Sequence, residues 1–233
     1  MRSALALTLT GLALSLPAEL QADEPAPRPV PAELLAKLAG TSAQFEAMMG
    51  KASFTVTGHM DDKEGTARVT MQGERAKVEI LKYIEDGQDK TEEAKQKAAE
   101  RAREPRKARS SRDEVHMPFL AGEQAKYDFW VGDVDARDPT HLRVFFHAKV
   151  PAENLMNGSA WVDAPSGDLL TASVTASKTP AFIDYVRAKF EFGERTSMGP
   201  AISKLSFDTA GGFLFVRKHY QGSATFTSYE LKP

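Results

Sequence analysis

The stretch from Met156 to Ala176 constrains the fold most strongly, because it has the pattern of two β-strands joined by a tight turn. Its sequence is MNGSAWVDAPSGDLLTASVTA, and Pro-Ser-Gly-Asp at its centre is typical of a turn. In the second arm, apolar and hydroxyl-bearing residues alternate, which predicts a strand with one buried and one solvated face. Trp161 lies in the first arm, and the apolar set of the second is Leu170, Ala172, Val174 and Ala176.

The same pattern recurs after Lys126, where eight strands are predicted: 127–134, 141–149, 159–164, 169–178, 182–192, 202–207, 213–220 and 224–231. Three earlier strands, 52–60, 66–72 and 75–84, are separated by short turns and should be antiparallel neighbours. Many short strands with Gly, Pro and Asp turns predict an antiparallel barrel, part-barrel or sandwich. We therefore expect a mainly β (α+β) fold in a single domain over 32–233, with all three arrangements still open.

The first 22 residues have the pattern of a secretory signal peptide: one arginine, an apolar run from Ala4 to Leu16, then Pro17 and small residues. The run is too short for a comfortable membrane span, although a retained N-terminal anchor is the alternative. Cysteine is absent, which excludes disulfides and the acylation site of a bacterial lipoprotein. We expect cleavage after Ala22, with Ala18 as the competing position, and a soluble periplasmic protein without a lipid anchor.

Residues 23–31 carry proline at every second position from Pro25 to Pro31, which predicts an extended tether. From Ala32 to Met49, apolar residues recur at helical spacing, but Gly40-Thr41-Ser42 interrupts them. This pattern predicts a helix with a break, whose apolar face packs on the sheet.

A charged insertion occupies about residues 89–112, and its segment 91–109 has no large apolar side chain. It predicts a peripheral helix, stabilised by pairs such as Glu93 with Lys97. Its C-terminal end is basic: Arg101, Arg103, Arg106, Lys107, Arg109 and Arg112. These residues complement the helix dipole, or they form a patch for anionic lipid head groups or an acidic partner.

The sequence shows no catalytic or cofactor motif. Of the five histidines, His141 and His147 share the predicted strand 141–149 but would lie about 20 Å apart at ordinary strand rise. The other three lie on separate elements, and none fits a metal-binding or nucleophile pattern. A net charge of −2 gives no field that would attract nucleic acid. Asp163 and Asp168 flank a turn, where aspartate commonly bonds to the backbone, and for Asp184 we expect a buried partner such as Arg187 or Arg195. We therefore predict no enzyme activity, no cofactor and no metal.

Motifs within the repeated strands resemble a known family. GSAWVD at 158–163, SGDLL at 166–170 and the Thr-Pro-x-Phe strand from Thr179 follow a leader, a proline-rich tether and an N-terminal helix. Together they look like the outer-membrane lipoprotein-sorting family, the Lol-type periplasmic carriers. The resemblance implies a strongly curved, incomplete antiparallel sheet that is covered by helices and encloses a cavity for acyl chains.

Two functions follow from this fold. The first is a periplasmic, non-enzymatic carrier of a lipid, a lipoprotein acyl group or a similar hydrophobic ligand, acting as a monomer with a membrane surface or another envelope protein as partner. Its candidate cavity residues are Phe129, Phe146, Trp161, Val174, Phe182, Val186, Phe190, Phe192 and Phe215. The alternative is a structural or interaction module of the envelope whose aromatic residues fill a solid core.

Overall fold

The computed structural model of the chain describes residues 28–73, 75–103, 115–213 and 216–231. Within these ranges there are two α-helices, α1 (Ala32–Met49) and α2 (Thr91–Arg103). The strands are β1 (Arg28–Pro29), β2 (Ala52–Met60), β3 (Lys63–Gln72), β4 (Arg75–Glu85), β5 (Gln88–Asp89), β6 (Tyr127–Val134), β7 (His141–Ala148), β8 (Met156–Asp163), β9 (Leu169–Ala176), β10 (Ile183–Glu191), β11 (Glu194–Thr196), β12 (Gly199–Ala201), β13 (Lys204–Phe213) and β14 (Val216–Leu231).

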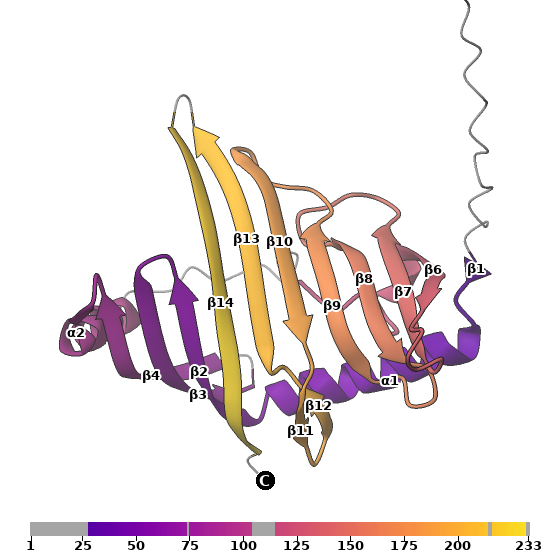
Figure 1. Ribbon diagram of the computed structural model, residues 1–233, viewed down its shortest axis with the longest axis horizontal. Helices are drawn as coiled ribbons and strands as arrows, with labels where there is room; N and C mark the ends of the chain where they lie inside the picture. The colour runs from indigo at the N-terminus through magenta and orange to yellow at the C-terminus, as the bar shows by residue number, and fades with distance from the viewer. Residues whose placement is uncertain (1–27, 74, 104–114, 214–215, 232–233) are drawn as a thin grey trace, which may run out of the picture.

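One twelve-stranded sheet dominates the molecule, in the order β1-β6-β7-β8-β9-β10-β13-β14-β2-β3-β4-β5 (Figure 1). Its neighbouring strands are all antiparallel. In the described part of the chain, the edge strands β1 and β5 do not pair with each other, so the sheet is open. The predicted mainly β fold with an incomplete barrel is confirmed.

Two runs of consecutive strands make up this sheet, and a long-range pairing joins them. β6 to β10 continue into β13 and β14, while β2 to β5 form the other run. The two runs meet where β14 pairs with β2, for example at Phe226 and Val56. The short strands β11 and β12 form a separate hairpin.

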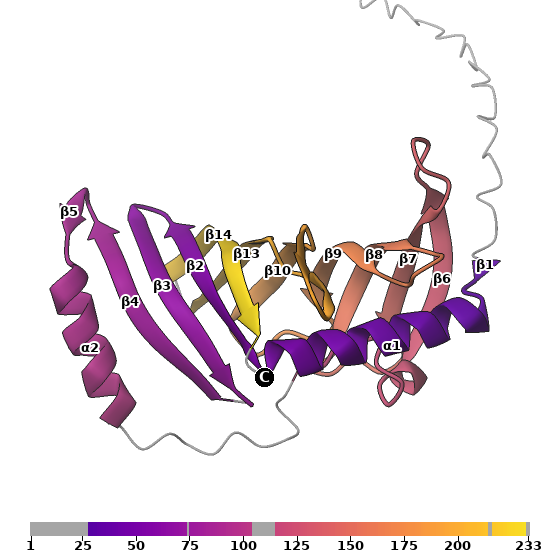
Figure 2. The same ribbon diagram turned by 90° about the horizontal axis from the view of Figure 1, so that it is seen from below.

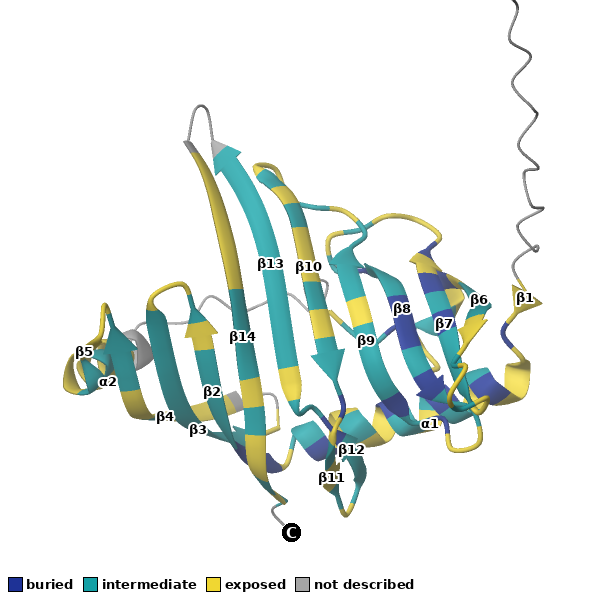
Figure 3. Cartoon of the chain, viewed as in Figure 1, coloured by how far each residue is buried: buried dark blue, intermediate teal, exposed yellow. Residues whose placement is uncertain are grey.

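Helix α1 lies across one face of the sheet (Figures 1 and 2). We call this the helix face, and it carries Val144, Phe146, Ala160, Val162, Ala172, Val174 and Phe190. The opposite side, which we call the polar face, carries Phe145, Ser159, Ser173, Arg187, Lys189, Ser206 and Asp208. The core forms where Leu34 and Leu38 of α1 pack on β7 and β8, and Figure 3 shows the buried residues gathered there.

The predicted break in the N-terminal helix is wrong, because α1 is continuous through Gly40, Thr41 and Ser42. The Thr41 hydroxyl lies 2.7 Å from the Gly167 carbonyl oxygen, to which it donates. Gly167 has a φ of +77°, and a Cβ there would lie 2.7 Å from Lys37 Cβ. The β8–β9 turn therefore packs directly on α1, and this contact outweighs the weak local helix propensity.

Ser42 offers a test of the contact between α1 and the sheet. The residue is fully buried, and its Oγ has no hydrogen-bond partner among the described residues. We expect Ser42→Ala to raise the free energy of unfolding by about 1 kcal/mol, because it removes an unpaired hydroxyl and has higher helix propensity. Urea denaturation measures the change. Thr41→Ala is the control and should destabilise the protein. A destabilised Ser42→Ala variant would instead indicate a bound water that satisfies the hydroxyl.

The last two strands differ from the prediction. We expected strands at 202–207, 213–220 and 224–231, but β13 and β14 form one long hairpin instead. Gln221-Gly222, which resembles a turn, lies in the middle of β14. A Cβ on Gly222 would lie 2.6 Å from Phe207 Cζ. This glycine therefore makes room for a neighbouring aromatic ring and does not end the strand.

Helix α2 is peripheral, as predicted. It lies beside β4 at the far edge of the sheet (Figure 2), and most of its described side chains are exposed. The expected ion pair between Glu93 and Lys97 is present at 2.6 Å. The Thr91 hydroxyl accepts a hydrogen bond from the Tyr83 backbone nitrogen (2.9 Å), which ties the start of α2 to β4.

In the ranges that the structure describes, no helix is both long and apolar enough to cross a lipid bilayer.

Candidate functional site

An apolar pocket of about 230 Å³ lies on the helix face, beneath the C-terminal half of α1. Four parts of the chain enclose it: Phe45 of α1, the segment 115–119, the strands β7 to β10, and Phe192 with Ile202 on either side of the β11–β12 hairpin. The lining is predominantly hydrophobic and aromatic, as ligand-binding pockets usually are. The pocket is therefore the candidate site for a hydrophobic group.

Aromatic contacts fix the walls of this pocket. Phe119 is 2% exposed, and its ring packs edge-on against Phe146 with centroids 5.4 Å apart. On another wall, Phe45 meets Phe192 edge-on at 5.6 Å. These edge-to-face pairs hold the rings in defined orientations. The pocket is thus bounded by rings that pack against one another.

The structure brings together four of the nine residues that the sequence suggested for a cavity. Phe146, Val174, Phe190 and Phe192 all line the pocket. The sequence analysis did not select Phe45 or Met156 for the lining, nor the segment 115–119. The apolar run Val115-His116-Met117-Pro118-Phe119 was a usable signal, since such a run between polar segments is expected to enter a core.

Trp161 does not line the pocket, contrary to the predicted cavity set. It pairs with Arg143 and Thr171 on the polar face. Its neighbours Ala160 and Val162 are buried on the helix face, so strand alternation places Trp161 on the other side. In β9 the register shifts between the partners of Trp161 and Val162, and a bulge of this kind changes which residues face the core. For the same reason Leu169 is buried (4% exposed), while Leu170, which we expected on the apolar face, is half-buried.

The other predicted cavity residues lie elsewhere. Phe129 packs behind Phe119 at 5.7 Å, within the core. Phe182 precedes β10 at the end remote from α1 (Figure 1), has a φ of +73° and is 62% exposed. Val186 is near the same end and is 38% exposed. These two side chains lie beyond the area that α1 covers. Phe215 lies outside the described residues.

The predicted basic cluster cannot be placed as a surface. Arg101 and Arg103 belong to the last turn of α2, but their side chains are not described. Arg106, Lys107, Arg109 and Arg112 lie outside the described residues. The patch therefore stays a prediction.

The carboxylates singled out in the sequence have structural contacts. Asp163 accepts hydrogen bonds from the Ser166 backbone nitrogen (3.0 Å) and hydroxyl, which confirms its turn role. The bond from the Ser166 hydroxyl lowers the pKa of Asp163 below its usual value. Asp168 pairs with Arg195 at 2.7 Å.

The expected partner of Asp184 is wrong, and so is its expected burial. Its carboxylate is 43% exposed and contacts Arg217, 3.1 Å away on β14. The β10–β13 register shifts between Ile183 and Tyr185, which disturbs the alternation from which we placed Asp184 on the apolar face.

As for metal binding, the described residues hold no group of three His, Cys, Asp or Glu side chains that could bind an ion.

Comparisons with known proteins give one structural likeness. No family model matches the chain, and no curated protein matches it. The structure is similar to the crystal structure of the LolA superfamily protein NE2245 from Nitrosomonas europaea, with 8% sequence identity and a TM-score of 0.41. The similarity covers 83% of this chain and 93% of that chain.

Proposed function

We propose that the protein is a non-enzymatic carrier or binding protein of the cell envelope that takes up an acyl chain of a lipid or lipoprotein. The observation that carries this proposal is the apolar pocket between α1, the segment 115–119 and β7 to β10, which we call the acyl pocket. An open sheet leaves such a pocket accessible from its edges, whereas a closed barrel would bury it. Affinity would come from burying an acyl chain, at about 25 cal/mol per Å² of apolar surface.

The size of the pocket limits what can enter. Its volume of about 230 Å³ is below the roughly 300–1,000 Å³ of pockets that enclose drug-sized ligands. One segment of a single acyl chain fits this space better than a whole lipid does. The polar head group would then remain outside the pocket.

Two features from the sequence complete the proposal. The leader at 1–22, followed by the tether at 23–31, would direct the protein to the periplasm, and the absence of cysteine would leave it without an acyl anchor. The basic cluster that begins at Arg101 would contact anionic head groups or an envelope partner. The domain over 32–233 would then act alone, as a monomer.

Phe190→Ala tests the pocket as a binding site. Phe190 lines the pocket and is only half-buried, so its truncation mostly enlarges an existing space. We expect the free energy of unfolding to fall by clearly less than the roughly 3–5 kcal/mol typical of a close-packed phenylalanine. The affinity for a fluorescently labelled long-chain fatty acid should change several-fold. Urea denaturation and fluorescence titration of one variant give both values.

Phe226→Ala is the matched control for this experiment. Phe226 is also half-buried on a strand of the same sheet, but it packs on Phe54, with centroids 5.7 Å apart, and does not line the pocket. Its replacement should leave fatty-acid affinity unchanged. If the wild-type protein binds no fatty acid and Phe190→Ala shows a full core penalty, the carrier proposal fails. The structural module with a solid core would then be the better description.

A further inference from the structure

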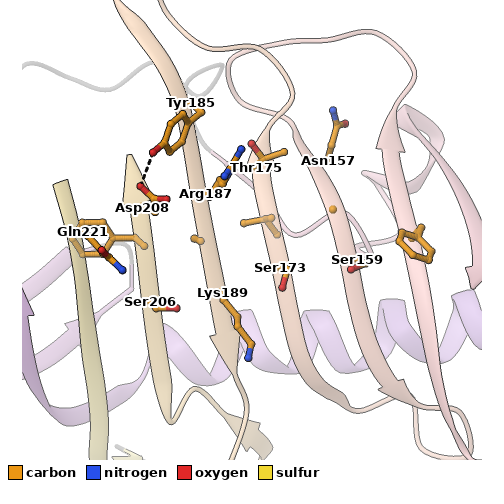
Figure 4. Close-up of a pocket in the computed structure, with 15 residues that line it drawn as sticks. Asn157, Ser159, Ser173, Thr175, Tyr185, Arg187, Lys189, Ser206, Asp208 and Gln221 are labelled. Atoms are coloured by element: carbon orange, nitrogen blue, oxygen red, sulfur yellow. Dashed lines mark hydrogen bonds between the residues drawn. The ribbon is translucent and has the colours of Figure 1, made fainter. Parts of the chain in front are cut away.

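A second hollow lies on the polar face, opposite α1 and separate from the acyl pocket. It has a volume of about 620 Å³ and crosses β8, β9, β10 and β13, with one wall on β14. Figure 4 shows its polar side chains in front of the sheet, with the helix behind the strands. We call this hollow the serine groove.

Strand register explains why the sheet is hollowed here. Partner residues in antiparallel strands project to the same face, and one row across the sheet consists of small side chains around a lysine. The row is Ser159, Ser173, Lys189, Ser206 and Ser223. The next row has larger side chains and forms a wall: Asn157, Thr175, Arg187, Asp208 and Gln221. A serine floor beside a taller wall gives an elongated groove.

The groove continues beyond β14. A neighbouring hollow of about 540 Å³ shares Lys189, Ser206 and Gln221 with it and extends through Ser223 to His59 on β2. From β8 to β2 the two hollows cross five strand spacings, a length of roughly 24 Å at about 4.8 Å per spacing. This length suits an extended chain better than a small compact molecule.

Contacts within the protein hold several polar side chains of the groove in place. Arg187 stacks on the Tyr185 ring, 4.6 Å from its centroid. The Tyr185 hydroxyl in turn donates to Asp208 Oδ1 at 2.9 Å, as Figure 4 shows. His219 Nε2 lies 2.7 Å from the same oxygen, and these two contacts lower the pKa of Asp208, so it is ionised at neutral pH.

Several side chains remain free to bind a ligand. Within the described ranges, the Arg187 guanidinium and the side chains of Ser173, Ser206 and Gln221 make no hydrogen bond to the protein. Guanidinium groups only donate, carboxylates only accept, and hydroxyl and amide groups do both. The groove therefore offers donors and acceptors side by side.

The balance of charge favours a neutral ligand. The serine groove holds the cations Arg187 and Lys189 and the ionised Asp208. The neighbouring hollow adds Lys204, Asp61 and Glu191, and Glu191 lies 3.4 Å from the Lys189 ammonium. A polyanion would meet these three carboxylates together with the cations, which disfavours its binding. A chain of neutral hydroxyl groups can satisfy both the donors and the acceptors.

We propose that the serine groove binds an extended neutral saccharide chain, whose hydroxyl groups pair with Arg187, Asp208 and the serine floor. Phe145 closes one end of the groove with an apolar wall; its ring stacks on Trp130 with centroids 5.5 Å apart. The site lies on the opposite face from the acyl pocket, and it does not depend on the proposed carrier function.

Titrations of the ¹⁵N-labelled protein with maltotetraose and with chitotetraose test this site. We expect amide shifts on addition of at least one saccharide, at Ser173, Lys189 and Ser206. Ser173 is exposed and forms part of the floor of the groove. Ser173→Leu fills the groove with a larger side chain and should weaken saccharide binding at least ten-fold. Arg187→Ala, also exposed, should weaken it without filling the groove, which keeps the test valid if the leucine variant misfolds.

Thr225→Leu is the matched control. Thr225 is exposed on the same face of β14 but lies outside both hollows, so its replacement should not change saccharide affinity. The proposal is overturned if neither saccharide shifts the groove amides, or if Ser173→Leu and Arg187→Ala bind as tightly as the wild type. It is also overturned if inorganic phosphate, but neither saccharide, shifts these amides. Fatty-acid binding is measured separately, so the two proposals can fail independently.

Discussion

Gly158→Ala is expected to lower the free energy of unfolding by at least about 3 kcal/mol, at the upper end of the cost of overpacking. Gly158 lies in β8 between its partners Phe146 on β7 and Val174 on β9. A Cβ at this position would overlap the Ser173 carbonyl oxygen and lie 3.0 Å from Val174 Cα. The obstructing atoms belong to the backbone of a paired strand, so no side-chain rotation relieves the clash. Urea denaturation measures the loss.

Gly58→Ala is the matched control, because Gly58 also lies in a central strand of the same sheet. A Cβ there would meet only the Ser223 carbonyl oxygen, at an ordinary 3.7 Å. Gly58→Ala should change the free energy of unfolding by no more than about 1 kcal/mol, because alanine loses less backbone entropy than glycine when the chain folds. Equal stabilities of the two variants would show that β8 and β9 separate easily, and would contradict the packing described above.

Leu38→Ala is expected to cost about 3–5 kcal/mol. Leu38 is fully buried where α1 meets the sheet. The β8–β9 turn already packs against the helix backbone at Gly167, which leaves it little room to move into the space. The cavity left by the substitution should therefore persist. The free energy of unfolding, measured with urea, gives the loss.

The control for Leu38→Ala is Leu35→Ala on the same helix. Leu35 is only partly buried against the core, so its truncation should cost roughly half as much or less. Neither residue lines the acyl pocket, and fatty-acid affinity of the folded variants should match that of the wild type. If Leu38→Ala cost no more than Leu35→Ala, the helix would not be anchored where the structure places it.

Local sequence was sufficient for much of the sheet. The expected strands 52–60 and 127–134 coincide with β2 and β6, because apolar periodicity and turn residues act over a few residues. The helix break was wrong because the Thr41 hydroxyl bonds to Gly167, a residue 126 positions away in the sequence. A contact of that range leaves no signal in the helix segment itself.

The candidate sites were less predictable than the strands. Phe146 and Phe190 were correctly placed on one face. Trp161 was not, because β8 buries the smaller Ala160 and Val162, and strand alternation then places Trp161 on the polar face. The serine groove was missed for a different reason. Its residues, such as Ser159 and Ser206, lie on separate strands, and only the register places them in one row.

The pairing of β14 with β2 also determines the order in which the chain can assemble. During synthesis, β2 to β4 can form a local meander early, and β6 to β13 can form another. The two meanders have no strand pairing with each other until Val216–Leu231 has been made. Contacts so distant in sequence slow folding and leave strand edges open while the ribosome completes the chain. A truncation before β14 would therefore yield two separate sheets and expose β2 and β13 to aggregation.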